Sequence, residues 1–441
     1  MSIYFKYNPG VGFVDTLRYG AEVVSGRFTI YINGRPSGQT YYANMSVGTI
    51  TIDRNSEFRR SGEITIEVNP TVPPPPLVPA NPTSALAPFG HEIFIETGVD
   101  SSGTNIPNSY TTTWIPNGLF TIATSTVNDT GPDMTVTLTI YDRSWTIAQR
   151  VLQNPYNFPA VGGNFTKEIQ ALLNMVWMEQ KNVAPLQYNI VPTSQQVPTA
   201  SYDQGSDPWQ AALDMAAAIG YELYFDRAGV VVGKPIPNPY KTASIWNFTD
   251  DTVAVLGLQG QGSESLLGGP YSTPVEVAVV MTRDQIYNNI VIQGTGYANA
   301  AVYNGQGLET SAQPQLAAAA DTNPSSPTYL YGPMGVVTNF VQSSLVTEAG
   351  AQAMAKNDLR AALSSAWTCT LNIAPNPIFD VDDVVTVTRP RVGLNNATMV
   401  LDTITQTVNY AETMQLTGRI LTNYNNTSGG NTSIYSGGAP S

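Results

Sequence analysis

The residue types that most often carry out chemistry are scarce in this sequence. Its 441 residues include one cysteine, Cys369, and one histidine, His91. These counts exclude an internal disulfide, a cysteine-based zinc site and any metal site built on two or three imidazoles. Cys369 alternates with polar residues in the strand-like run 367–371, which predicts a buried structural thiol rather than a nucleophile. His91 stands beside the strand-like run 93–95, and no Gly-x-Ser-x-Gly motif is present with which it could form a hydrolase triad.

The densest acidic cluster comprises Asp380, Asp382 and Asp383. A calcium loop would need alternating oxygen ligands, a glycine at its turn and a bidentate glutamate at a fixed distance. Here Val384 follows at once and begins a strand-like run. The sequence therefore favours a solvated turn at the start of a strand over a metal site. The acidic pair at 250–251 is interpreted in the same way, as part of a loop.

Other motifs give no clear ligand. The glycine-rich run 257–262 is similar to a phosphate-binding loop, but no lysine and no helix follow it. Without a helix N-terminus the usual phosphate contacts are missing, so we expect a flexible loop. The glycosylation triplets at Asn164 and Asn247 are interpreted as chance products of an Asn- and Thr-rich chain, because no signal peptide is visible.

Carboxylates are numerous enough for a glycoside hydrolase, since aspartate and glutamate total 33. Such an enzyme needs two carboxyl groups at a set separation, one with a raised pKa, and no pair stands out. Six tryptophans and 23 tyrosines could form a sugar-binding face, although core or interface packing is their commoner role. The sequence thus predicts no enzyme and no cofactor, and it nominates no catalytic, cofactor-binding or metal-binding residue.

Low charge is the strongest compositional signal. Charged residues make up 12%, against about 25% in an average soluble domain, and the net charge is −13. A surface with so few charges must be covered by neutral polar side chains or hidden against other subunits, as in a large assembly. Basic residues are scattered, with Arg59-Arg60 the only adjacent pair, which argues against nucleic-acid binding. No run approaches the ~18 apolar residues of a membrane span.

Residues 1–150 predict a barrel-like β domain. Strand-like alternation occurs at 49–52, 64–68, 92–96, 118–122 and 134–140. In the last of these, threonines alternate with apolar residues, which is typical of a half-buried antiparallel strand. A proline-rich bridge at 70–88 should be an extended segment rather than part of the core.

Residues 151–250 change character and predict a small α+β unit. A first helix with apolar spacing covers 166–180. A second helix has Asp207 as its N-cap, Pro208 at its first position and Gly220 just past its end. The residues after Gly220 alternate like a β-hairpin.

Residues 251–421 predict a second barrel-like β domain with one amphipathic helix at 347–365. Strand-like runs lie at 253–258, 275–281, 289–293, 367–373, 384–388, 399–407 and 414–420. A long polar loop is expected at 295–333, and the Gly/Ser/Asn-rich residues 422–441 predict a flexible tail. The expected fold class is therefore mainly β, with two β-barrel-like domains flanking a small α+β unit.

Short motifs in both halves have counterparts in known proteins. The first set is Gly48-Thr-Ile-Thr-Ile-Asp53-Arg54, Phe58-Arg59-Arg60, Ala87-Pro-Phe-Gly-His91 and Tyr141-Asp142-Arg143. It resembles the minor tail proteins of siphophages that infect actinobacteria. The second set is Asp207-Pro-Trp-Gln-Ala-Ala-Leu213, Gly220-Tyr-Glu-Leu-Tyr-Phe-Asp226, Tyr287-Asn-Asn-Ile-Val-Ile292 and Ile378-Phe-Asp-Val-Asp-Asp-Val384. It resembles the hub fold shared by phage tail tips and contractile baseplates. Together the resemblance extends over 48–421, and no lysozyme or peptidase domain fits the sequence.

The resemblance implies a structural protein of the virion, assembled in the host cytoplasm and located at the phage tail tip. It implies a ring-like hub, a homotrimer, that joins the tail tube and distal tail protein to tip and fibre proteins. The partners it implies are the distal tail protein, the tape measure protein and other minor tail and fibre proteins. DNA would pass through such a ring without specific binding, which negative charge would favour. The alternative is a receptor- or carbohydrate-binding tail protein that contacts a host surface glycan. Its aromatic residues would form an exposed cluster, whereas those of a hub would be buried or in subunit contacts.

Overall fold

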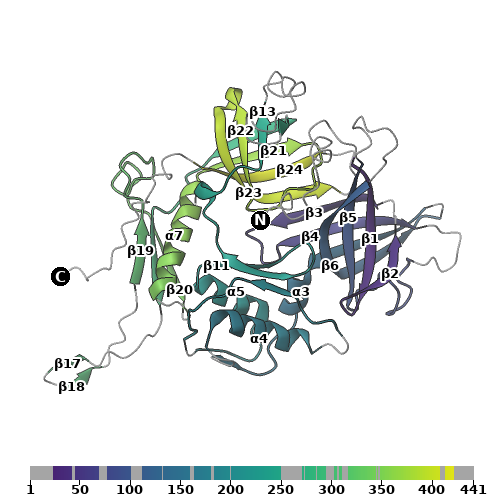
Figure 1. Ribbon diagram of the computed structural model, residues 1–441, viewed down its shortest axis with the longest axis horizontal. Coiled ribbons are helices and arrows are strands. Elements are labelled where there is room, and N and C mark those ends of the chain that lie inside the picture. The colour runs from purple at the N-terminus through teal and green to yellow at the C-terminus, as the bar shows by residue number, and fades with distance from the viewer. Residues whose placement is uncertain are drawn as a thin grey trace.

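The computed structural model is that of a mainly β protein with an α+β unit packed beside a large sheet, which confirms the expected fold class (Figure 1). The structure describes residues 23–41, 45–68, 77–100, 112–131, 133–158, 163–179, 183–198, 200–249, 271–272, 274–284, 286–294, 302–304, 307–309, 316–343, 345, 348–407 and 413–421.

The bounds of the elements are as follows. The strands of the large sheet are β1 (Val23–Ile32), β2 (Arg35–Tyr41), β3 (Met45–Asp53), β4 (Arg60–Val68), β5 (His91–Asp100), β6 (Thr112–Asp129), β7 (Met134–Asp142), β13 (Trp246–Thr249), β14 (Tyr271–Ser272), β15 (Glu276–Met281), β21 (Trp367–Ile373), β22 (Val384–Arg389), β23 (Leu394–Thr407) and β24 (Met414–Leu421). The remaining strands are β8 (Tyr156–Phe158), β9 (Tyr188–Ile190), β10 (Ala200–Tyr202), β11 (Tyr221–Phe225), β12 (Val231–Pro235), β16 (Asn289–Gly294), β17 (Val302–Asn304), β18 (Gly307–Glu309), β19 (Leu316–Ala320) and β20 (Thr338–Ser343). The helices are α3 (Arg143–Ala148), α4 (Phe165–Trp177), α5 (Pro208–Ala218) and α7 (Glu348–Ser364), with 3-10 turns η1 (Pro239–Lys241) and η3 (Pro390–Val392).

Two groups of strands that are far apart in the sequence share the large sheet. Its order is β14-β13-β22-β23-β3-β4-β7-β6-β5-β1-β2, and β24, β21 and β15 branch from β23. The two groups meet where β3 pairs antiparallel with β23, from Asp53 opposite Thr403 to Thr49 opposite Thr407. Main-chain pairing therefore makes both groups one continuous sheet.

Alternation along each strand decides which face of the sheet is buried. In β7, Val136, Leu138 and Ile140 are fully buried, and the threonines between them are partly exposed. The apolar faces form two cores, one in the β1–β7 group and one around Trp246 and Leu371. This confirms the predicted half-buried strand at 134–140.

The α+β unit has the local signals expected of it. Asp207 caps α5 by accepting hydrogen bonds from the backbone N–H of Trp209 and Gln210 at 2.7 and 3.2 Å. Gly220 ends the helix with a φ of 72°, a conformation that glycine adopts at little cost. Strands β11 and β12 follow as an antiparallel hairpin, as predicted.

Helix α7 confirms the predicted amphipathic helix, because its stripe of Ala351, Ala355, Leu359 and Leu363 is buried. The expected polar loop at 295–333 is wrong in part, since β19 lies within it and pairs with β16. Alanine is a weak strand former, but the alanines of β19 are buried in the same core as α7, and this packing overrides intrinsic propensity.

The proline-rich bridge also departs from expectation. Residues 77–88 form turns, and within them Leu86 and Ala87 are fully buried. The bridge is therefore part of the N-terminal core over this stretch, because Leu86 fills one end of it. The predicted strand at 253–258 and the tail at 422–441 lie outside the described residues. No helix in the described part of the chain is long and apolar enough to cross a membrane.

Candidate functional site

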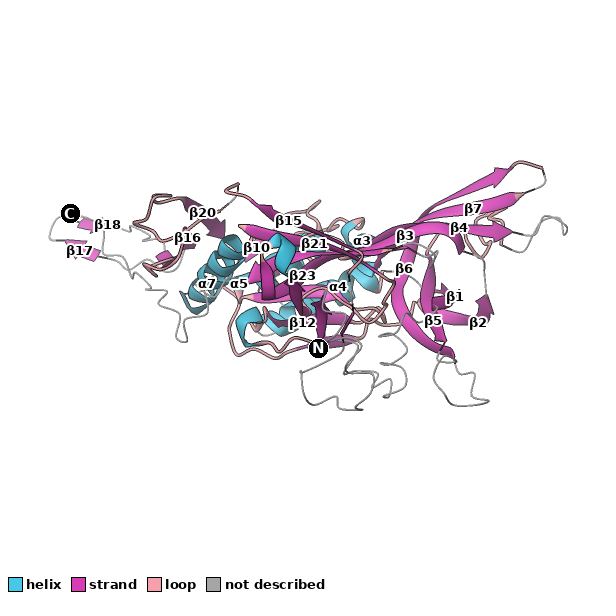
Figure 2. Ribbon diagram, turned by 90° about the horizontal axis from the view of Figure 1, so that it is seen from above, coloured by secondary structure: helices cyan, strands magenta, loops and turns pink. Residues whose placement is uncertain are grey.

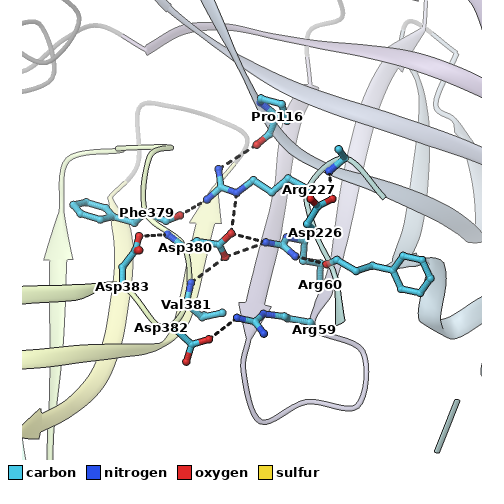
Figure 3. A network of polar contacts seen from close by, with 12 residues as sticks. Arg59, Arg60, Pro116, Asp226, Arg227, Phe379, Asp380, Val381, Asp382 and Asp383 are labelled. Carbon is cyan, nitrogen blue, oxygen red and sulfur yellow. Dashed lines mark hydrogen bonds and ion pairs between the residues drawn. The ribbon is translucent and has the colours of Figure 1, made fainter. Parts of the chain in front are cut away.

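Five charged side chains from distant parts of the sequence meet in the interior (Figure 3). Arg59 and Arg60 stand at the start of β4, Arg227 lies in the turn between β11 and β12, and Asp380 and Asp382 lie in the loop before β22. We call these five residues the charged junction. Three stretches that lie far apart in the sequence therefore each contribute at least one member.

Arg60 is the central member, with a side chain that is 1% exposed. Its Nη2 donates to Asp380 Oδ1 at 2.9 Å and to Oδ2 at 2.7 Å, and its Nη1 donates to the carbonyl of Phe225 at 2.7 Å. Its backbone N–H donates to the Asp142 carboxylate at 2.9 Å. One side chain thus ties the N-terminal sheet to the β11–β12 hairpin and to the loop before β22.

Arg227 approaches the same carboxylate from the hairpin. Its Nε donates to Asp380 Oδ2 at 3.3 Å, and its Nη1 donates to the carbonyls of Pro116 and Pro377 at 3.1 and 2.6 Å. Its Nη2 donates to the carbonyl of Phe379. The planar fork of arginine suits this arrangement of fixed acceptors, which a lysine could not match. Arg227 thereby fixes the hairpin turn on β6 and on the loop before β22.

Arg59 forms the third set of contacts. Its Nη2 donates to Asp382 at 2.8 Å, and its Nη1 lies 3.4 Å from Glu222. The guanidinium also lies 3.7 Å from the centre of the Tyr224 ring, a cation–π distance. Glu222 is held in turn by Lys234 at 3.1 Å. Strands β11 and β12 therefore present both signs of charge to the junction.

Opposite charges keep the two aspartates of the junction ionised. Burial alone would raise the pKa of Asp380, but Arg60 and Arg227 outweigh it and hold that pKa well below its usual range. Burial would raise the pKa of Asp382 as well, but Arg59 and Arg54 together outweigh it and lower that pKa. Both carboxylates are therefore charged at neutral pH.

Asp383 lies beside the junction and behaves differently. It is 8% exposed, and its Oδ2 accepts a hydrogen bond from the backbone N–H of Asp380 at 2.9 Å. Burial raises the pKa of Asp383 to about 7, only partly offset by that hydrogen bond. This carboxyl group therefore changes its charge near neutral pH.

The expected solvated turn at 380–383 is wrong. The turn is buried because guanidinium groups neutralise its carboxylates, a partnership that no local spacing in the sequence reveals. The one available signal was the Arg59-Arg60 pair, unusual in a chain with so little charge. Among the described residues, no group of three or more His, Cys, Asp or Glu side chains is placed to hold a metal ion.

A second buried ion pair lies between the N-terminal sheet and the hairpin turn. Arg143 donates to both oxygens of Glu92, at 2.6 and 2.8 Å, and to the carbonyl of Gly229 at 3.1 Å. Gly229 has a φ of 73°, and a Cβ added there would lie 2.7 Å from Leu119. The close approach of the turn to β6 therefore requires glycine at this position.

The other residues nominated by the sequence are dispersed. Cys369 is 1% exposed in β21, and burial raises its pKa to about 12, as expected of a structural thiol. His91 is buried at the start of β5, Asn164 caps α4 by accepting from Thr166 at 2.9 Å, and Asn247 lies in β13. The runs at 250–251 and 257–262 fall outside the described residues.

Two clefts flank Arg59, each with a volume of about 440 Å³. One lies between the loop before β4 and α5, and the other lies between β12 and the loop before β22. On their walls Arg59, Asp380 and Asp382 are engaged in the junction. The arrangement is therefore suited to holding segments together.

A polar face covers much of the large sheet on the side away from its cores. It runs over eight strands in the order β15-β21-β24-β23-β3-β4-β7-β6. Cross-strand registers place on it Thr49, Thr51, Ser61, Glu63, Thr65, Glu67, Thr124, Thr126, Thr135, Thr137, Thr139, Thr368, Thr370, Thr403, Thr405, Thr407, Gln415 and Thr417. We call this set the hydroxyl face.

Hydroxyl groups pair across neighbouring strands of this face. The Oγ1 atoms of Thr65 in β4 and Thr137 in β7 are 3.1 Å apart. The Oγ1 atoms of Thr370 in β21 and Thr417 in β24 are also 3.1 Å apart. In the described strands the one basic side chain on this side is Arg419, which is paired with Asp402 at 2.7 Å. The face is therefore neutral to negative and rich in hydroxyl groups.

No protein-family model matches the sequence, and no curated protein matches it. Several solved structures are similar to this chain in fold. The tail protein from Neisseria meningitidis MC58 is similar with a TM-score of 0.55 and 11% identity, over 90% of this chain and 96% of that one. The 43 kDa tail protein of prophage MuSo2 from Shewanella oneidensis is similar with a TM-score of 0.52 and 11% identity, over 90% of this chain and 98% of that one. The chain has the fold of these tail proteins.

Proposed function

We propose that the chain is a structural component of a phage tail tip: a ring-like, trimeric baseplate hub that joins the tail tube and distal tail protein to tip and fibre proteins. The observation that carries this proposal is the extent of the shared fold. It covers 90% of this chain and at least 96% of each of the two tail proteins. A likeness from end to end favours a shared role more than one common module would.

The charged junction supports the same role. A tail component must keep its parts in fixed positions while neighbouring proteins pull on it. Arg60 and Arg227 contact three separate parts of the chain through hydrogen bonds of 2.6–3.3 Å. Removing one member of such a buried set leaves an uncompensated charge, which is strongly unfavourable. The junction therefore favours one arrangement of the three parts.

The hydroxyl face supports passage of DNA. A lumen for a polyanion should be hydrated and should carry few cations, because lysine and arginine bind phosphates and retard sliding. The hydroxyl face offers threonine hydroxyls together with Glu63 and Glu67, and its arginine is neutralised by Asp402. We assign it to the inner wall of the ring, along which DNA passes without specific binding.

Antibody labelling of phage particles tests the proposal. Antibodies raised against the purified chain should place gold particles at the tail end in negative-stain images of virions that carry this protein. Mass measurement of the purified chain, with images of the same sample, should show a threefold ring. Labelling absent from virions, or found on the head, would exclude a tail-tip role.

The second candidate is a receptor- or glycan-binding tail protein. Exposed aromatic side chains favour it, since Tyr331 is 70% exposed and Phe340 is 69% exposed near the β19-β16-β20 sheet. Aromatic rings at such positions can stack on sugars. A glycan array probed with the chain and with a Tyr331→Ala variant separates the two candidates. Binding that is lost in the variant supports the receptor role, and no binding supports the hub.

A further inference from the structure

Strand β15 is an open edge of the large sheet. Within the described part of the chain it pairs only with β21, from Glu276 opposite Asn372 to Met281 opposite Trp367. The strand contains no lysine, arginine or proline; it begins with the exposed Glu276, and Val280 and Met281 are 55% and 73% exposed. An exposed apolar edge of this kind is a template for pairing with another strand.

The far half of β6 is a second open edge. Strand β5 pairs with β6 only as far as Thr121, whereas β7 continues to pair with it as far as Asp129. Residues 123–129 therefore have one neighbouring strand among the described residues. They too lack lysine, arginine and proline, and Val127 is 39% exposed. Figure 2 shows β7, the partner of this segment, projecting at one end of the molecule beyond the helices.

The two edges are the opposite ends of one run of strands. The run β15-β21-β24-β23-β3-β4-β7-β6 is antiparallel at every step. Because it contains an even number of strands, β6 of one copy and β15 of the next would also be antiparallel. A head-to-tail contact of this type repeats from copy to copy, and it closes into a ring when the rotation from one copy to the next divides a full turn.

The faces of the two edges also match. In β6, Thr124 and Thr126 lie on the hydroxyl face, and Val127 points to the opposite side, level with the buried Val136. In β15, Ala278 lies on the face of Thr370, while Val277 and Val279 pack against the core. Pairing would therefore continue both the hydroxyl face and the apolar side across the contact.

Strand β2, another end of the large sheet, has features that oppose pairing. Strand β2 carries Arg35, Pro36 and Gly38 within seven residues. Charge, proline and glycine are the usual means by which natural edge strands avoid association. These features disfavour pairing at β2, whereas β15 and residues 123–129 contain none of the lysines, arginines or prolines that would do the same.

We propose that β15 of one copy pairs with residues 123–129 of the next, so that the large sheet continues through the ring with the hydroxyl face on one side. The partner is a second copy of this chain. The inference rests on the ring of the proposed function and names the surfaces that form it.

Cysteine cross-linking tests the contact directly. Ala278→Cys is combined in turn with Thr124→Cys, Thr126→Cys or Asn128→Cys, since facing residues of adjacent strands come close enough for a disulfide. After mild oxidation, at least one double variant should give a ladder of covalent multimers on a non-reducing gel. Each single variant should stay monomeric on the gel, and the native Cys369 is buried and should not contribute. Covalent dimers of a single variant would show that β15 pairs with β15, or β6 with β6, of another copy, and would overturn the inference.

A charge at the contact provides the second test. Met281→Arg should weaken assembly at least about tenfold in a concentration series of mass measurements, because Met281 lies on the apolar side of β15, opposite Trp367, where an unpaired charge buried by the contact is costly. Val191→Arg is the control, since Val191 is 42% exposed in the loop after β9, within the α+β unit, and it should assemble normally. Equal assembly of both variants, or no ladder in any double variant, overturns the inference. Gold labelling at the tail end would in that case still support the tail-tip role, so the two proposals fail separately.

Discussion

The Arg60 guanidinium donates a hydrogen bond of 2.7 Å to the Asp380 carboxylate, although the two residues are 320 positions apart in the chain. Arg227 reaches the same carboxylate at 3.3 Å from the α+β unit. Burying such charges costs hydration free energy, so the pairs contribute little net stability compared with apolar packing. Their effect is instead on specificity, because any other arrangement of the three parts leaves a guanidinium buried without a carboxylate.

Asp380→Asn should lower the free energy of unfolding by about 3–5 kcal/mol, because it leaves Arg60 and Arg227 without their shared counter-charge. Urea denaturation followed by tryptophan fluorescence measures this. Asp284→Asn, at an exposed position, is the control and should change stability by less than about 0.5 kcal/mol. A loss below about 1 kcal/mol for Asp380→Asn would mean that the junction does not fix the fold.

Asp383 should make stability depend on pH. Its pKa is about 7 in the folded chain and about 3.9 when unfolded, so the folded state binds the proton more tightly. As the pH rises from about 4 to 7, the unfolded state loses this proton first, and the free energy of unfolding falls by about 2–4 kcal/mol. Asp380 affects stability in a different pH range. Because its pKa is lowered in the folded chain, it stabilises the fold at neutral pH, and this stability is lost only as the pH falls below about 4.

Asp383→Asn should remove that fall, because an amide cannot ionise yet can still accept the hydrogen bond from Asp380. Denaturation of the variant and the wild type at several pH values between 4 and 8 measures the difference. Asp203→Asn, at an exposed position, should keep the wild-type profile. Identical profiles for the wild type and Asp383→Asn would contradict the raised pKa.

Gly418→Ala should destabilise the chain by about 3 kcal/mol. A Cβ at this position would overlap the carbonyl oxygen of Val400 and lie 2.8 Å from its carbon, in backbone that cannot move aside easily. Thermal denaturation compares the variant with Gln415→Ala, an exposed change in the same strand that should cost less than about 0.5 kcal/mol. Equal melting temperatures would show that β23 and β24 are less tightly paired than described.

Lysines on the hydroxyl face should make the protein bind DNA. A variant with Thr65→Lys, Thr137→Lys and Thr417→Lys places three cations on that face, whereas Ser194→Lys with Ser325→Lys places cations on exposed loops. Gel-shift assays at physiological salt should show no binding by the wild type, because it has no cationic track for phosphates. Assembled rings of the first variant should retain DNA more strongly than rings of the second. Tight binding by the wild type would remove the case for a passive lumen.

The Cys369 thiol should be inert in the folded chain. It is 1% exposed, and burial raises its pKa to about 12, so almost no thiolate forms at neutral pH. A chromogenic disulfide reagent should react with one thiol per chain in denaturant and with none in buffer. Fast reaction in buffer would show that β21 opens readily.

The sequence by itself determined the elements whose causes are local. Asp207, Pro208 and Gly220 set the ends of α5, because caps and left-handed turns depend on neighbouring backbone groups. The threonine alternation of β7 predicted a half-buried strand, because the side-chain period of a strand is two. The buried stripe of α7 followed from helical spacing in the same way.

Only the tertiary structure decided which distant segments meet. Nothing near Asp380 indicates that its partners are Arg60 and Arg227, so a buried set of charges was interpreted as a solvated turn. The alanines of β19 form a strand only because β16 lies beside them and their core is shared with α7. The pairing of β3 with β23 likewise joins segments about 350 positions apart, since Asp53 lies opposite Thr403. Local patterns fix backbone geometry and the apolar side of each element, whereas partners are chosen by burial and charge neutralisation summed over the whole fold.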